Sequence, residues 1–353
     1  MKYLSSLNKK PLSQTGTVLR SSRFLLIFAA IMLILVMAAG VFAEGAGKLT
    51  PIIFSLDWTP NTNHTGVYAA KALGYYEEAG LDVQIVQPPD SGALLMCAAG
   101  QAQFAVDAQD TMAASLDLDE PLGITAVAAI LQHNTSGIIS RAGDGITSAK
   151  GLEGKTYATW DSPIELAMIR YCMEKEGADF NKLRLIPNNI TDEPAALTSH
   201  QTDAVWIFYG WSGINAEVSD FSFDYWDFRG LTEELDYYTP VIIANNKFLA
   251  EQPETAKAFL AATVKGYEYA IEHPEEAAEF LIAGDTTGAL EDARDLVYAS
   301  QQWLSDQYTA DATAWGVFDP DRWNGFYNWL YTNNLSAHDL TGKGFSNDYL
   351  PQE

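Results

Sequence analysis

Residues 52–86, IIFSLDWTPNTNHTGVYAAKALGYYEEAGLDVQIV, decide the fold. The apolar run at 52–56 predicts a strand, and the turn-forming residues at 57–64 predict a loop after it. Residues 65–73 have the pattern of a helix that Gly74 stops, and residues 83–86 predict the next strand. A strand, a helix and a second strand in this order predict a βαβ unit, and its repetition indicates a mostly parallel sheet covered by helices.

The same alternation continues along the chain. It predicts a helix over 93–99, strands at 104–106, 125–131, 137–139, 156–159, 183–186, 204–208 and 241–244, and helices that begin near 109, at Ser162-Pro163-Ile164-Glu165, at Pro253 and at Pro274. The pattern restarts near residue 136 and returns to the first unit near 240. We therefore expect two α/β lobes, with lobe I at 44–135 plus 241–353 and lobe II at 136–240. Connections at 131–138 and 239–245 would form the hinge, and the cleft between the lobes is a natural small-molecule site.

The first 43 residues have the features of an export segment. A basic stretch with Lys9, Lys10, Arg20 and Arg23 precedes an apolar run at 24–43, which ends in Val41-Phe42-Ala43. This pattern predicts a signal peptide cleaved after Ala43, although the run is also long enough for an uncleaved membrane anchor. No Cys near the cleavage point could carry a lipid. We expect an exported protein, either periplasmic or at the outer face of the cytoplasmic membrane.

The chain is strongly acidic. Its 353 residues include 21 Lys and Arg against 46 Asp and Glu, for a formal charge of −25. Residues 1–43 hold five of those basic residues and none of the acidic ones, so the exported part carries about −30. Such a surface repels phosphate backbones and excludes nucleic acid as a partner. A neutral or cationic small molecule is easier to accommodate than a polyanion.

Cysteine and histidine give no indication of a metal site. Cys97 and Cys172 are the only cysteines, and we expect two buried apolar side chains without a disulfide between them. The five histidines are scattered, and no Cys/His spacing is typical of zinc. The sequence therefore predicts neither a metal nor a cofactor.

One segment resembles a known family. Residues 56–66, LDWTPNTNHTG, resemble the opening motif of the thiamine-pyrimidine-precursor proteins, which include bacterial ABC-transporter substrate-binding proteins and the yeast-type pyrimidine synthase. The likeness extends to residues 74–83, 100–104, 209–213, 319–323 and 345–351. It implies a type II periplasmic-binding-protein fold, two α/β lobes joined by a two-crossing hinge. It also implies a monomer that binds a thiamine-related pyrimidine, or a similar small heterocycle, and delivers it to an ABC permease.

The resemblance also separates the binding proteins from the synthase. The yeast-type synthase has a pyridoxal-phosphate lysine, with a His four residues later, where this chain has Asp107 and Thr111. The synthase's cysteine cluster has no counterpart in residues 236–240. A Schiff base needs an amine, so we expect no catalytic residues and no enzyme activity. The alternatives are a binding protein for riboflavin, a sulfonate or nitrate, a membrane-tethered sensor, and, less favoured, the synthase itself.

Nine residues are candidates for ligand binding. They are Trp58, Asn61, His64, Gln109, Asp110, Trp160, Tyr209, Trp211 and Ser212. Trp58 would stack on a flat ring, unless it caps the sheet as a core residue. Asn61 offers a donor and an acceptor, or serves the turn after Pro60, and His64 either contacts the ligand or is satisfied by backbone.

The other candidates have equally simple structural alternatives. Gln109 and Asp110 could bind exocyclic amino groups, although Asp110 is better explained as a helix N-cap. Trp160 would form the opposite wall of the cleft or pack under its loop. Strand alternation places Trp206 and Phe208 in the core and sends Tyr209 and Trp211 to the cleft. At Ser212 many relatives of the resembled family have an acid, which leaves the ligand's identity open. The C-terminal aromatics Trp303, Trp315, Trp323, Trp329 and Tyr331 are expected to pack within lobe I.

Overall fold

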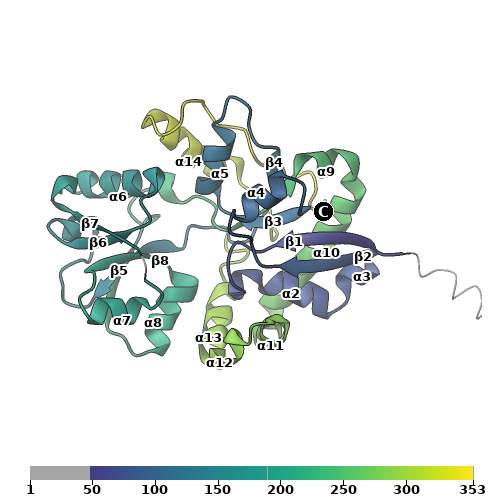
Figure 1. Cartoon of the computed structure of the whole chain (residues 1–353), viewed down its shortest axis with the longest axis horizontal. Helices are drawn as coiled ribbons and strands as arrows, with labels where there is room; N and C mark the ends of the chain where they lie inside the picture. The colour runs from purple at the N-terminus through teal and green to yellow at the C-terminus, as the bar shows by residue number, and fades with distance from the viewer. Residues whose placement is uncertain (1–47, 189, 353) are drawn as a thin grey trace, which may run out of the picture. The chain divides into compact units, whose positions relative to one another are not determined.

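The computed structural model describes residues 48–188 and 190–352, and its strands form two sheets (Figure 1). The expected signal peptide or anchor at 1–43 lies outside these residues, so cleavage after Ala43 stays a prediction. No helix in the described part of the chain is long and apolar enough to cross a bilayer.

The first sheet has five strands in the order β2-β1-β3-β10-β4. Their bounds are β1 Thr50–Ser55, β2 Leu81–Val86, β3 Phe104–Asp107, β4 Ile124–Ala129 and β10 Val241–Asn245. β1 is parallel to β2 and β3, whereas β10 is antiparallel to both of its neighbours. The sheet is therefore mixed, with one reversed strand among four that share a direction.

The second sheet repeats this plan in the order β7-β6-β8-β5-β9. Its strands are β5 Ser136–Arg141, β6 Thr156–Thr159, β7 Arg184–Pro187, β8 Ala204–Phe208 and β9 Phe223–Asp227. Here β5 is the reversed strand, antiparallel to both β8 and β9. In each sheet the reversed strand is the one that the chain enters directly after leaving the other sheet. The predicted parallel pattern missed this reversal because alternation along the chain carries no direction.

Helices connect and cover the strands. The helices are α2 Thr65–Ala72, α3 Tyr75–Glu78, α4 Ala93–Ala98, α5 Gln109–Leu116, α6 Pro163–Lys175, α7 Glu193–Thr198, α8 Ile214–Val218, α9 Asn246–Glu251, α10 Pro253–Glu272, α11 Pro274–Gly284, α12 Ala289–Asp292, α13 Arg294–Ser305 and α14 Pro320–Thr332. Single turns of 3-10 helix are η1 Thr62–His64, η2 Ala149–Leu152, η3 Phe180–Lys182 and η5 Glu233–Leu235, and η4 Tyr209–Gly213 is a π-helix.

The central strands are buried on both faces. In β3, Phe104 and Val106 pack into one apolar cluster with α2 and α10, while Ala105 between them packs into another with Met112 of α5. β10 is divided in the same way. Because strand side chains alternate between faces, a strand covered on both sides becomes a continuous apolar run. This explains why β3 and β10 are easy to recognise in the sequence.

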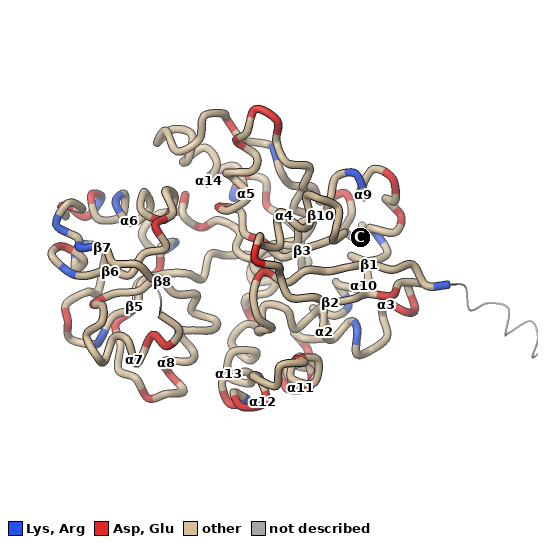
Figure 2. The backbone as a smooth tube through the Cα atoms, in the orientation of Figure 1, with Lys and Arg blue, Asp and Glu red and all other residues tan. Residues whose placement is uncertain are grey.

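Two segments connect the sheets, residues 130–135 between β4 and β5 and residues 228–240 between β9 and β10. We call them the first and second crossings. The expected hinge segments at 131–138 and 239–245 lie in the crossings only at 131–135 and 239–240, because residues 136–138 belong to β5 and Val241–Asn245 is the buried strand β10. The division into lobes I and II at the proposed boundaries remains a proposal. The acidic excess is spread along the described chain, and no single segment contains most of it (Figure 2).

The C-terminal aromatics are only partly a first-sheet core. Trp315, Trp323 and Trp329 are buried, but Tyr331 is 45% exposed, so its expected packing was wrong. Trp303 lies with its ring 5.4 Å from that of Tyr209, which follows β8 of the second sheet. These long side chains face neighbours that helical spacing alone does not identify.

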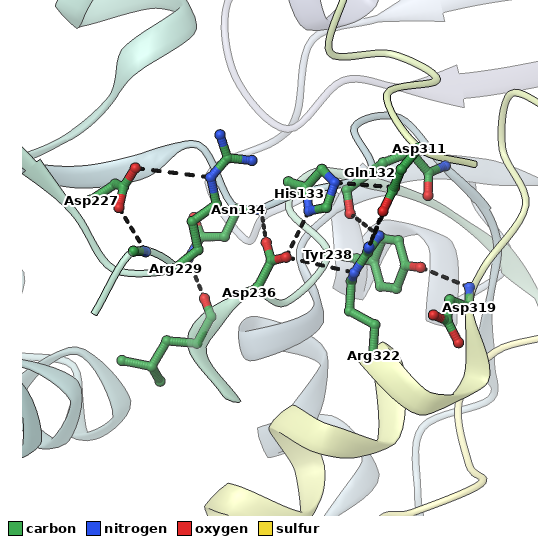
Figure 3. A network of polar contacts seen from close by, with 12 residues as sticks. Gln132, His133, Asn134, Asp227, Arg229, Asp236, Tyr238, Asp311, Asp319 and Arg322 are labelled. Atoms are coloured by element: carbon green, nitrogen blue, oxygen red, sulfur yellow. Dashed lines mark hydrogen bonds and ion pairs between the residues drawn. The ribbon is translucent and has the colours of Figure 1, made fainter. Parts of the chain in front are cut away.

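Charged side chains tie the two crossings together (Figure 3). His133 of the first crossing lies 2.6 Å from Asp236 of the second through Nδ1, and its Nε2 lies 3.1 Å from Asp311. The backbone N–H of Asn134 donates to Asp236 at 2.9 Å. Arg322 lies 3.1 Å from Asp311 and donates to the carbonyl of Gln132 at 2.8 Å. Partial burial raises the pKa of Asp311. The positive charges of Arg322 and His133 have the larger combined effect, so the pKa lies below its ordinary value.

Asp236→Ala is expected to destabilise the protein by about 1–3 kcal/mol, because it leaves His133 and the N–H of Asn134, both in the first crossing, without their acceptor. Urea unfolding followed by fluorescence would measure the loss. Asp311→Asn is the matched control: its carboxylate is 62% exposed, so the change should cost less than about 1 kcal/mol. Equal losses in the two variants would contradict a special role for Asp236.

Candidate functional site

A pocket opens where the C-terminal end of β1 approaches the end of β8. Its lining comes from the loop after β1, from the segment that follows β8, and from the end of the second crossing. The lining residues are Asp57, Trp58, Asn61, Asn63, Phe208, Trp211, Ser212, Thr239 and Pro240. The cavity measures about 520 Å³, the open solvent at its mouth included. Both sheets therefore contribute residues to one pocket.

Trp58 is the most exposed aromatic residue of this pocket. It is 63% exposed, although Ser55 at the end of β1 and the following Leu56 are fully buried. A core tryptophan capping the sheet, the structural alternative, would be covered. Its exposed ring faces a site that Phe208 and Trp211 also line, so it is available for stacking on a flat ligand.

Asn61 and His64 hold the loop in shape. The side chain of Asn61 accepts from the N–H of Asn63 at 3.0 Å and donates to the carbonyl of Thr59 at 3.0 Å. His64 is fully buried, and its Nδ1 accepts from the N–H of Asn61 at 3.1 Å. Asn61 still lines the pocket, whereas His64 does not. The structural alternative therefore describes His64 better than direct ligand contact.

Asp57 is a pocket residue that the sequence reasoning missed. One carboxylate oxygen lies 2.8 Å from Nε2 of His64. Because Nδ1 of that ring already accepts a backbone N–H, Nε2 carries the proton and donates it to Asp57. The buried histidine thus orients an acceptor at the pocket. The position of Asp57 immediately after a strand was the available signal, since strand C-terminal ends line such clefts.

On the opposite side, β8 leads into η4. Ser212 lines the pocket and donates a hydrogen bond from Oγ to Oε1 of Glu193, at the start of α7, at 3.0 Å. Trp211 lines the pocket beside it. Ser300 of α13 connects the two sides: its hydroxyl lies 2.5 Å from that of Thr62 and also donates to the carbonyl of Gly210.

The assignments of Phe208 and Tyr209 are reversed. Phe208 was expected in the core but is 39% exposed and lines the pocket, because β8 ends there and no helix covers the last residue. Tyr209 does not line the pocket. Its ring packs 4.9 Å from Tyr225 and 5.4 Å from Trp303. Its hydroxyl donates to Glu217, and burial followed by this carboxylate raises its pKa.

The side chain of Gln109 is fully engaged in hydrogen bonds within the protein. It is fully buried, donates to the carbonyl of Trp323 at 2.7 Å and accepts from the N–H of Tyr238 at 3.0 Å. It therefore connects the second crossing to α14 and lies outside the pocket lining. These partners are 214 and 129 residues away in the sequence, which is why a local pattern could not reveal them.

Asp107 ends β3 and Asp110 lies in the first turn of α5, and neither lines the pocket. Ala108 is the helix N-cap, so the expected capping role of Asp110 was wrong. Burial raises the pKa of Asp110 to about 6. Hydrogen bonds from the backbone N–H groups of Asp110 and Thr111 and from the Tyr237 side chain partly offset this increase. Burial likewise raises the pKa of Asp107 to about 7, while Thr111 and the Ala108 N–H lower it and the charges of Asp110 and Asp57 raise it.

Trp160 is presented by a turn that a buried carboxylate organises. Glu165 is 5% exposed and accepts from the hydroxyls of Tyr157 at 2.7 Å and Thr159 at 2.9 Å, and from the N–H of Trp160. Its bond to the N–H of Ser162 is consistent with the predicted helix start. Trp160 itself is 51% exposed, so it is not packed under the loop, but it does not line the pocket.

Chemically, the pocket offers aromatic faces, the acceptors Asp57 and Ser212, and the amides of Asn61 and Asn63, which can both donate and accept. Asp57 is its one ionisable lining residue, and no lysine or arginine lines it. Among the residues with described positions, no group of three or more His, Cys, Asp or Glu could hold a metal ion. The arrangement suits a planar ligand that is neutral or cationic.

The fold and the pocket define the class. The product of a Candida albicans gene described as having the generic periplasmic binding protein fold superposes with a TM-score of 0.59, over 86% of this chain and 99% of its own, at 14% identity. The protein thus has the periplasmic-binding-protein fold, as predicted.

Sequence comparison then gives the family. The model described as NMT1/THI5 like matches residues 61–277, more than half of the chain, so the protein belongs to the NMT1/THI5-like family. A formylaminopyrimidine-binding protein from Halalkalibacterium halodurans is 26% identical over 80% of this chain and 84% of that protein. A 4-amino-5-hydroxymethyl-2-methylpyrimidine phosphate synthase from Candida albicans is 27% identical over 64% of this chain and 69% of that protein.

Proposed function

We propose that this protein is the extracytoplasmic solute-binding component of an ABC importer and that it binds an aminopyrimidine precursor of thiamine. One observation carries the proposal: exposed Trp58 from the loop after β1 shares a pocket with Phe208, Trp211 and Ser212 from the end of β8. The similarity to a formylaminopyrimidine-binding protein supports the choice of ligand. The basic and apolar N-terminal segment supports export to the periplasm or the outer face of the membrane.

The mechanism would be ligand-dependent closure. A ring held between the two sides contacts segments of both sheets at once, and the two crossings are the connections about which the sides would move. A ligand shifts this equilibrium only through contacts that it gains in the closed state. An ABC permease would then recognise the closed form and accept the solute. We expect the protein to act as a monomer.

The rival function is pyrimidine synthesis, which the similarity to the named synthase brings into consideration. The resemblance places Asp107 where the synthase has its lysine, and Thr111 donates a hydrogen bond to Asp107 in place of the histidine. A carboxylate cannot form a Schiff base. An absorbance scan of the purified protein after incubation with pyridoxal phosphate separates the two functions, because a synthase would acquire the cofactor's visible band.

Trp58→Ala is expected to weaken binding of formylaminopyrimidine by about 10–100-fold, since stacking on an aromatic ring is worth about 1–3 kcal/mol. The melting temperature without ligand should barely change, because the ring is 63% exposed. Titration calorimetry and thermal shift would measure both. Tyr331→Ala, which removes another exposed aromatic far along the chain, is the control. Unchanged affinity in the Trp58 variant would remove this pocket as the binding site.

A further inference from the structure

We propose that the pocket selects its ligand through two preset hydrogen-bond acceptors, Asp57 on one side and Ser212 on the other. Each is held by a partner outside the pocket lining, His64 for Asp57 and Glu193 for Ser212. The site therefore takes a planar heterocycle that donates hydrogen bonds from two substituents, an amino group and a neighbouring N–H or O–H, and it disfavours the corresponding oxo compounds and anions. This inference rests on the proposed function and specifies its ligand chemistry.

The first acceptor is fixed by a buried imidazole. His64 is fully buried, and its ring position is set by the N–H of Asn61 on Nδ1 and by Asp57 on Nε2. The Asp57 side chain is 36% exposed and uses one oxygen for this contact at 2.8 Å. An ionised carboxylate can only accept hydrogen bonds, so its remaining capacity faces the pocket as an acceptor. A ligand N–H satisfies it, whereas a ligand carbonyl is repelled.

The second acceptor is a hydroxyl whose proton is already committed. Ser212 donates its single hydroxyl proton to Oε1 of Glu193 at 3.0 Å. Only the lone pairs of Oγ then remain for the pocket, so this serine acts as an acceptor. Glu193 does not line the pocket and is a positioning residue: it decides which hydrogen-bonding role Ser212 presents.

The aromatic and charged lining agrees with this polarity. Trp58, Phe208 and Trp211 offer ring faces, and the rest of the lining is Asn61, Asn63, Thr239 and Pro240 beside the two acceptors. No lysine or arginine is present to neutralise an anion, and Asp57 adds a negative charge. A sulfonate or nitrate would face this carboxylate uncompensated. A ligand that donates to both Asp57 and Ser212 instead bridges the segments after β1 and β8.

The test compares two probes that differ in a single group, 4-amino-5-hydroxymethyl-2-methylpyrimidine and its 4-oxo analogue, by titration calorimetry. The wild-type protein should prefer the amino compound by about 10–100-fold, the range expected for a charge-assisted hydrogen bond. Asp57→Asn should reduce this preference at least about tenfold, because the amide can donate to the oxo group.

Glu193 provides a sharper variant pair. Glu193→Ala frees the Ser212 proton, so binding of the 4-oxo analogue should strengthen relative to the amino compound. Glu193→Gln should keep most of the wild-type preference, because its amide oxygen still accepts that proton. Asp82→Asn and Glu174→Ala remove exposed charges from β2 and α6 and should leave the preference unchanged.

The outcomes separate the two proposals. If the wild-type protein binds neither pyrimidine, the proposed function fails and the inference falls with it. If it binds them but Asp57→Asn and Glu193→Ala keep the wild-type preference, only the acceptor pair is overturned. If Glu193→Gln changes the preference as much as Glu193→Ala does, the acceptor pair is also overturned. The glutamine oxygen can still accept the Ser212 proton, so equal effects would mean that Glu193 acts through local structure and not through this hydrogen bond.

Discussion

Gly266→Ala should destabilise the protein by about 3 kcal/mol or more and lower its melting temperature by roughly 6–12 °C. A Cβ at this position of α10 would lie 2.0 Å from the carbonyl oxygen of Gly66 and 2.7 Å from the Cβ of Ala70, both in α2. The first of these atoms belongs to the backbone and cannot rotate away. The two helices would have to separate, and a protein interior is too densely packed to absorb such a shift cheaply.

The same substitution should also weaken ligand binding. α2 begins at Thr65, directly after the pocket loop, so any displacement of the helix moves that loop. Gly325→Ala is the matched control, because it too lies inside a helix but a Cβ there has no heavy atom within 4 Å. Alanine's better helix propensity should make that variant more stable by up to about 1 kcal/mol. Calorimetric melting of both variants would check the opposite signs, and two similar losses would contradict the explanation.

Asp107→Asn should stabilise the protein by about 2 kcal/mol at pH 7.5 and have little effect near pH 4. Burial raises the pKa of Asp107 to about 7, above the ordinary value of 3.8. Between these values the folded state retains a proton that the unfolded state has lost. The free energy of unfolding contributed by this group therefore falls as pH rises through the window from about 4 to 7, and it is constant above it. Because Asp107 is partly exposed, we expect a smaller stabilisation than the whole pKa shift would correspond to.

Asparagine can still accept hydrogen bonds from Ala108 and Thr111, so the variant removes the charge and preserves the contacts. Urea unfolding between pH 4.5 and 8 would show a flatter stability profile for the variant. Asp117→Asn is the contrasting control. Burial raises the pKa of Asp117, but hydrogen bonds from the N–H groups of Ala337 and His338 outweigh this effect, so the pKa lies below its ordinary value. That variant should lose stability at neutral pH, and an unchanged profile for Asp107→Asn would refute the prediction.

Local patterns predicted the elements well but the site only in part. Ser162, Pro163 and Glu165 start α6 as expected, because a helix start depends on neighbours a few residues apart. Asn61 and Trp211, like Trp58, line the pocket. The roles of Gln109 and His64 depended instead on partners chosen by the tertiary fold. The prediction for Phe208 was wrong because alternation predicts the face of the sheet on which a side chain lies. It does not predict where along the strand that face becomes exposed.

The direction of β5 and β10 was equally hidden. Both are short apolar runs, and the sequence of such a run is compatible with either orientation. What fixes their direction is the path of the crossings, which brings the chain to each sheet from the end opposite to that used by the other strands. The polar contacts among Asn134, His133 and Asp236 stabilise that path.

The two cysteines offer a view of how this protein opens. Cys97 of α4 and Cys172 of α6 are free and fully buried, and burial raises the pKa of each thiol to about 12. An alkylating reagent reacts with the thiolate, so neither sulfur can be modified until its surroundings unfold. Because α4 packs on β3 of the first sheet and α6 follows β6 of the second, the two modification rates report transient exposure at two different helices of one apolar cluster. The modification rates of the two native thiols therefore measure local unfolding, and no probe has to be introduced by mutation.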